Sequence, residues 1–259
     1  TADDLAVDFF PQAGFADDAA RARAWIDFRA AARALARIGE HGSALAPLHW
    51  SHEDAGWLAS TSGPAGDVIG WLDFGAASLW LERRDPQEGA WIELVIKSMS
   101  DIERWTQRTA GTLAGRTAPD AATKSDPGHT MFIEHDADAL ADLEAIYEGA
   151  GLILNALNDA SQRTGQSPGT PTIDPSTLDA SITLGPLTIG LKPCLDHESG
   201  PHWFAVRTGD SIGQAHPAAP ALALHIGEYL HLDSGEAQHA RIAAFIAESC
   251  TKLIGPPHA

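Results

Sequence analysis

The amino-acid sequence predicts an α+β protein in which antiparallel sheets are flanked by helices. Long stretches with helical periodicity stand near both ends of the chain and in its middle. Short stretches of alternating apolar and polar residues lie between them, and several are separated by only a few turn residues. Strands joined by short turns pair antiparallel, so the helices are expected to pack against a sheet built from hairpins.

The first expected element is a helix over Asp17–Gly39, because this stretch is rich in alanine, begins with acidic residues and ends at glycine. Its apolar side is expected to hold Trp25, Phe28, Ala32 and Leu35.

Four arginines of this helix, at positions 21, 29, 33 and 37, are spaced by multiples of four and share another side. Such a row could bind an anion or an acidic partner. We expect it to pair with carboxylates of the same chain, which carries more acidic than basic residues.

Strands and a second helix complete the first half. The expected strands are Val68–Phe74, Ser78–Arg84 and Trp91–Ser98. In the last of these, Ile92, Leu94 and Ile96 alternate with positions that include the polar residues Glu93 and Lys97. The pattern Ser-x-x-Glu at Ser100–Glu103 predicts a capped helix start, and the helix is expected to continue to about Gly115.

The second half repeats this order of elements. A long helix is expected over Asp136–Arg163, a loop over Thr164–Pro175, and a last helix from about Asp233 to Gly255. The expected strand cores are His129–Glu134, Ser181–Leu184, Leu187–Leu191 and His202–Thr208.

The polar segment Thr117–Pro127 is the candidate boundary between two α+β units, residues 1–120 and 128–259, which could also form one continuous domain. Both halves run helix, hairpin strands, helix, so a diverged duplication is a hypothesis.

The net charge of −18 excludes several classes of partner. Residues 117–259 hold six basic and 18 acidic residues, so they lack the clustered lysines and arginines that bind nucleic acid or an anionic membrane. The negative charge instead favours a basic protein partner, general solubility, or adaptation to salt.

No run of eighteen apolar residues is present, which predicts a soluble protein without a membrane span. The cysteines, Cys194 and Cys250, lack disulfide-framework or zinc-finger spacing, so we expect a reducing compartment, the cytoplasm, although one disulfide between them stays possible. Phosphate-loop and dinucleotide motifs are absent, so no cofactor is expected. Whether a leader preceded Thr1 is left open.

The stretch Leu222–His239 contains His225, Glu228 and His231 in the spacing H-x-x-E-x-x-H. In a strand the two imidazoles would stand roughly 20 Å apart, and in a helix they would lie on different sides, so this segment alone cannot form a one-metal site.

The best local cluster of histidines and acids is instead at the connection between two expected strands. It is the candidate metal site, the other interpretation being a polar hairpin connection. Its residues are Asp196, His197, Glu198 and His202.

The pentapeptide Gly209–Gly213 fits G-x-S-x-G and follows an expected strand. It resembles the nucleophile motif of lipases and esterases in the α/β-hydrolase family, and its Gly-Asp-Ser portion resembles the first block of the Gly-Asp-Ser hydrolases. The resemblance implies that Ser211 is the nucleophile, with Asp233 and either His239 or His258 as the other triad members.

The sequence departs from both families around this motif. Pro217 and Pro220 interrupt the helix that should follow the serine, and a His-Gly-Gly-Gly oxyanion segment is absent upstream. Only residues 212–259 follow Ser211. The alternative interpretation is a Gly-Asp-Ser turn that links two strands.

These observations favour an acidic protein that acts by binding or inhibiting a basic protein partner, without catalysis. The alternative is a hydrolase that uses Ser211 or the His/carboxylate cluster. Four tryptophans, Trp57, Trp71, Trp80 and Trp91, are expected in the core and rim of the first sheet and not in a ligand platform.

Overall fold

The structure is a computed structural model. It describes residues 18–39, 45–51, 56–116, 131–163, 169–192, 201–207, 222–225, 228 and 235–254.

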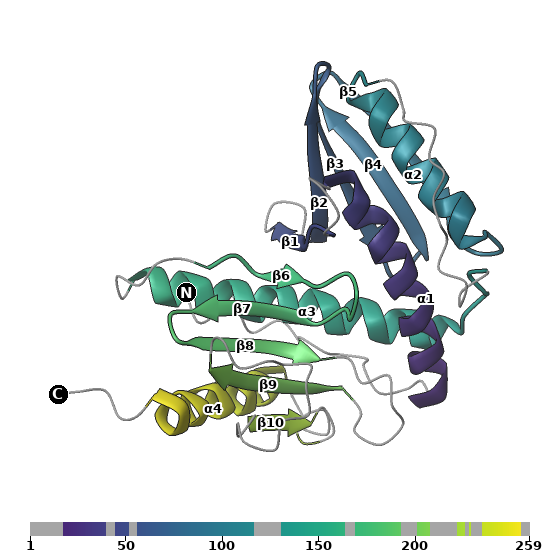
Figure 1. The fold of residues 1–259 in the computed structure, drawn as a ribbon. Helices are drawn as coiled ribbons and strands as arrows, with labels where there is room; N and C mark the ends of the chain where they lie inside the picture. The colour runs from purple at the N-terminus through teal and green to yellow at the C-terminus, as the bar shows by residue number, and fades with distance from the viewer. Residues whose placement is uncertain are drawn as a thin grey trace.

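The α+β prediction is confirmed: four α-helices accompany one antiparallel sheet of ten strands (Figure 1). The helices are α1 (Asp18–Ala36), followed by the 3₁₀ turn η2 (Arg37–Gly39), α2 (Met99–Leu113), α3 (Ala137–Arg163) and α4 (Gly235–Ile254). The strands are β1 (Leu48–Ser51), β2 (Gly56–Gly63), β3 (Gly66–Asp73), β4 (Ser78–Arg84), β5 (Gln87–Glu93), β6 (Thr172–Ile173), β7 (Ala180–Leu184), β8 (Leu187–Lys192), β9 (His202–Arg207) and β10 (Leu222–His225). None of the helices described here is long and apolar enough to cross a bilayer.

The sheet joins two halves with the same element order, a helix, five strands and a helix. The strand order is β10-β9-β8-β7-β6-β1-β2-β3-β4-β5, so each half is a meander and the halves meet where β1 pairs with β6. That junction is short, with Leu48 opposite Ile173 and His49 opposite Thr172. The division into two units at residues 117–127 and the duplication stay predictions.

Helix α1 forms where its composition predicts it, and the apolar side expected from its periodicity is buried. Trp25, Phe28, Ala32 and Leu35 are all buried in the main core. Helices α1 and α2 pack along one side of strands β2–β5 (Figure 1).

The expected strand Trp91–Ser98 is wrong in its bounds, because β5 begins at Gln87 and ends at Glu93. Leu94 still donates its N–H to the Ala77 carbonyl, but Ile96 donates to Phe132 and has a φ of 63°. Pairing has therefore passed from β4 to residues around Phe132, and Ile96 is 73% exposed and not in the core.

The capping serine of α2 is Ser98, not Ser100. Its hydroxyl accepts a hydrogen bond from the N–H of Asp101 at 3.1 Å. The predicted partner in the cap, Glu103, is instead buried and pairs with Arg37 at 3.5 Å.

The sequence pattern missed strands β1, β2 and β6. Strand β2 reads GWLASTSG and lacks the β-branched, alternating pattern of a typical strand. Strand β6 lies inside the expected loop Thr164–Pro175, and it extends because β1 and β7 pair with its two sides.

Helix α3 crosses from its own half to the sheet of the first half, and Tyr147 is its central contact. The Tyr147 hydroxyl accepts a hydrogen bond from Trp25 Nε1 at 2.6 Å and donates one to the Leu178 carbonyl at 3.0 Å. Gly151, one turn further along α3, lets the indole of Trp50 pack directly on the helix backbone.

We expect Gly151→Ala to destabilise the protein, because the added Cβ would overlap the buried six-membered ring of Trp50. Alanine is ordinarily the better helix former by about 1 kcal/mol, so a loss of about 1–3 kcal/mol in the free energy of unfolding would come from crowding. Chemical denaturation measures it. In a Trp50→Ala background, the same glycine substitution should become neutral or stabilising; destabilisation there as well would contradict the explanation.

Candidate functional site

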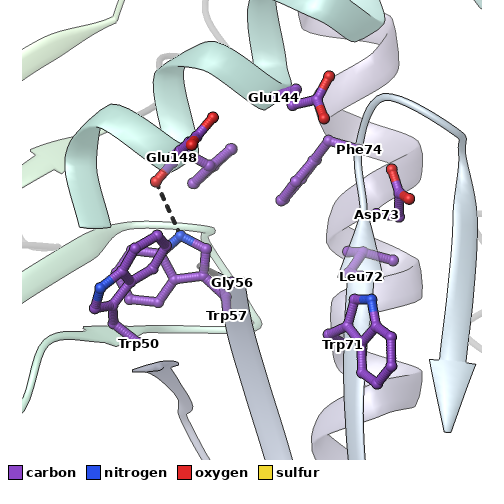
Figure 2. Close-up of a pocket in the computed structure, with 10 residues that line it drawn as sticks. Trp50, Gly56, Trp57, Trp71, Leu72, Asp73, Phe74, Glu144 and Glu148 are labelled. Carbon is purple, nitrogen blue, oxygen red and sulfur yellow. Dashed lines mark hydrogen bonds between the residues drawn. The ribbon is translucent and has the colours of Figure 1, made fainter. Parts of the chain in front are cut away.

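A cavity of about 240 Å³ lies between α3 and the ends of strands β1, β2 and β3. Figure 2 shows Glu144 and Glu148 reaching from α3, with Trp50 and Trp57 on one side and the end of β3 on the other. We call it the carboxylate cavity. It is lined by Trp50, Gly56, Trp57, Trp71, Leu72, Asp73, Phe74, Glu144, Tyr147 and Glu148.

Aromatic side chains form the walls of the carboxylate cavity and hold one another in place. Trp50 and Trp57 meet edge to face with their ring centroids 5.2 Å apart. Phe74 and Tyr147 stack at 4.5 Å with an interplanar angle of 9°. Trp57 Nε1 also donates a hydrogen bond to the Tyr147 carbonyl at 3.0 Å, which ties the strand wall to the helix wall.

Three carboxylates, those of Asp73, Glu144 and Glu148, converge on this cavity. Partial burial raises the pKa of Glu144, and the negative charges of Asp73 and Glu148 raise that pKa further. The Glu144 carboxylate lies against Gly75 in the β3–β4 turn, where any Cβ would overlap it. The glycine therefore allows the carboxylate to sit at the turn.

None of the ten residues described around the cavity is lysine, arginine or histidine. Two arginines of the predicted row bind other carboxylates of the chain, as expected: Arg21 of α1 pairs with Asp142 at 2.9 Å, and Arg37 of η2 pairs with Glu103. The carboxylates of the cavity thus lack a basic neighbour in the cavity wall. A cation supplied from outside would relieve their mutual repulsion.

Within the described part of the chain, no three His, Cys, Asp or Glu side chains are placed to share a metal ion, and this includes the three carboxylates of the cavity. Carboxylates that are farther apart, in a cavity with aromatic walls, suit a larger organic cation such as an ammonium or guanidinium group.

Most of the site residues predicted from the sequence lie outside the described residues. This applies to Ser211 and Asp233 of the hydrolase hypothesis and to Asp196, His197 and Glu198 of the metal hypothesis. His239 lies in α4. Both hypotheses stay predictions.

His202 begins β9, opposite Lys192 and His225, and its ring centroid is 5.3 Å from that of His225. Glu228 accepts hydrogen bonds from the backbone N–H of His225 and from Arg241, and His231 lies outside the described residues.

Sequence reasoning missed the carboxylate cavity, although one signal was present. Glu144 and Glu148 are four residues apart on a helix, where like charges repel, and no basic residue of the helix stands between them. The third carboxylate, Asp73, is distant in sequence. Trp57 is buried as predicted, yet it also forms the cavity wall together with Trp50.

No family model, no curated protein and no solved structure matches this chain. The geometry of the cavity is therefore the basis for assigning a function.

A further carboxyl group, Asp179, lies close enough to Tyr147 to influence its pKa. Burial raises the pKa of Asp179 from 3.8 to about 6, opposed by the positive charge of Lys192 and a hydrogen bond from Thr177. The folded protein therefore binds a proton here more tightly than the unfolded chain does. Protonated Asp179 therefore contributes to the free energy of unfolding below about pH 4, and this contribution is lost as the pH rises through about 6.

We expect Asp179→Asn to remove this loss, because asparagine has nearly the same shape and cannot ionise. The variant should be more stable than the native chain at pH 7 by an amount on the order of 1–3 kcal/mol and should show a flatter pH dependence between about 4 and 6. Urea denaturation across this range measures both effects. Asp159→Asn, an exposed change on α3, is the control, and equal behaviour of the two variants would contradict the prediction.

Proposed function

We propose that this chain is a binding protein that takes up a cationic side chain, lysine or arginine, of a basic protein partner in the carboxylate cavity. The observation that carries the proposal is the convergence of Asp73, Glu144 and Glu148 on an aromatic-walled cavity with no basic residue in its described wall. The proposed action is binding, and inhibition where the bound side chain belongs to the partner's own functional surface.

The energetics of the cavity support a cation of this kind. A guanidinium or ammonium group against an indole or phenol ring contributes about 0.5–2 kcal/mol. Glu144 and Glu148 are exposed at the rim, so each ion pair adds only about 0.2–1 kcal/mol. Their sum, about 1–4 kcal/mol, predicts weak affinity for a single side chain, so a stable complex would need further contacts with the partner.

The charge of the whole chain supports the same class of partner. A net charge of −18 attracts a basic protein over a distance and raises the association rate at low salt. Nucleic acid and anionic membranes remain excluded from the proposal by the scarcity of basic residues in the second half. The cytoplasm is the proposed location, because the cysteine pattern favours a reducing compartment.

We expect Glu144→Gln to weaken binding of a short arginine-rich peptide by up to about fivefold, and the double change Glu144→Gln with Glu148→Gln to weaken it further. Calorimetry at low salt measures the affinity. Asp159→Asn is the matched control, since it removes one exposed carboxylate from the same helix away from the cavity.

The pH dependence has a definite sign. Glu144 attracts a cation only when its carboxyl group is ionised, and the pKa of this group is raised. The affinity for the basic peptide should therefore increase as the pH rises through that pKa. Glu144→Gln should lose this increase. Equal weakening by the control variant, or an affinity that does not change with salt, would reject the proposal.

A further inference from the structure

Three tryptophans form a row across the sheet of the first half. Trp71 on β3 lies directly opposite Trp80 on β4, which lies directly opposite Trp91 on β5. The ring centroids are 5.8 Å and 5.7 Å apart, with interplanar angles of 3° and 24°. We call this stack of nearly parallel indoles the tryptophan row.

The tryptophan row stands on the side of the sheet opposite to α1 and α2. Successive residues of a strand point to opposite sides, and Leu72 and Leu79, the neighbours of Trp71 and Trp80, are buried in the core. Trp91 is 56% exposed. Trp71 also lines the carboxylate cavity, so the row extends from that cavity to the end of the sheet.

The stack leaves one ring surface free at its end. Among the described residues, Trp80 stacks with a tryptophan on each side, whereas Trp91 stacks with Trp80 alone and is 56% exposed. The row has one indole per strand, because the spacing of the rings is close to the spacing of paired strands, about 4.8 Å. The next ring position therefore lies beyond β5, where a further strand would pair. A strand added beside β5 would place the residue opposite Trp91 in that position.

Strand β5 has the free backbone groups that such an addition requires. It is the terminal strand of the described sheet, with β4 on one side only. The N–H of Leu94 points toward β4, because it binds the carbonyl of Ala77 in the β3–β4 turn. Backbone groups in an antiparallel strand point alternately toward and away from the paired strand, so the N–H and C=O groups of Trp91 and Glu93 point away from β4. Both residues are exposed. The outer edge of β5 is therefore a template for an extended segment.

The charges around the row select a basic segment. The neighbouring rows of side chains on the same face of the sheet contain carboxylates. One of these rows contains Glu82, and the other contains Asp73 and Glu93. A second copy of this chain would bring the same carboxylates against them. A flat guanidinium, by contrast, stacks on indole and pairs with carboxylate at once.

We propose that the edge of β5 binds an extended segment of the basic partner as an added strand, with an arginine opposite Trp91 that continues the tryptophan row. This inference rests on the proposed function and specifies its partner: a segment in extended conformation with arginine at alternate positions. The carboxylate cavity at the other end of the row is a separate contact.

The experiment uses a short peptide in which arginine and valine alternate. Amide hydrogen exchange of the unmodified protein should show peptide-dependent protection at Trp91 and Glu93. Trp91→Ala should weaken binding about tenfold, whereas Trp91→Tyr should keep most of the affinity, because a phenol ring still stacks on guanidinium. A peptide with glutamine for arginine, or with N-methylated backbone groups along one edge, should bind at least tenfold more weakly.

The outcomes separate this inference from the proposed function. If the peptide binds in a manner that depends on Glu144 and salt, but without protection in β5 and with no effect of Trp91→Ala, the edge inference is overturned and the cavity proposal stands. Protection of β5 without peptide, together with a dimeric mass, would assign the edge to a second copy and overturn the inference. Failure of every basic peptide to bind would overturn both.

Discussion

Tyr147 is the buried residue on which the arrangement of the two halves depends. Its hydroxyl joins Trp25 of the first helix to the Leu178 carbonyl of the second half, and its ring stacks on Phe74 at the end of β3. Burial raises its pKa well above 10, so the hydroxyl keeps the proton that it donates to Leu178. One side chain thus holds α3 against helix, strand and turn at once. The backbone pairing of β1 with β6 is too short to do this alone.

The carboxylate cavity follows from this placement of α3. Once Tyr147 is turned inward against Phe74, Glu144 and Glu148, one turn apart on the same helix, face the end of β3 and line one cavity with Asp73. The cavity stays open to solvent, which limits the cost of bringing three negative charges together. The same contact that joins the halves therefore also creates the acidic site.

The two faces of strands β3–β5 in the first half differ in the residues that they carry. The side under α1 and α2 holds leucine and small residues and forms the core, while the opposite side holds the tryptophan row among carboxylates. Stacked indoles stabilise neighbouring strands by about 0.5–1.5 kcal/mol per pair, so the row also strengthens the meander that it crosses. Acidic residues flank the row on this side, and they are the feature on which the proposal of a basic partner segment rests.

Local patterns in the sequence determined the fold class and most elements, because helix periodicity, alternation and turn residues act over a few neighbours. They placed α1, α3, α4 and β7–β9 well, and they assigned the buried side of α1 correctly. They failed where distant pairing decides: β6 extends only because β1 and β7 flank it, and Ile96 leaves the core because its backbone bonds to Phe132. The carboxylate cavity depends on the same long-range contacts, since Asp73 and Glu144 line one cavity only after α3 has packed against the strands of the first half. The sequence by itself shows that Glu144 and Glu148 are like charges one turn apart on a helix. Only the tertiary structure adds Asp73 and the aromatic walls, because these residues come from strands distant in sequence.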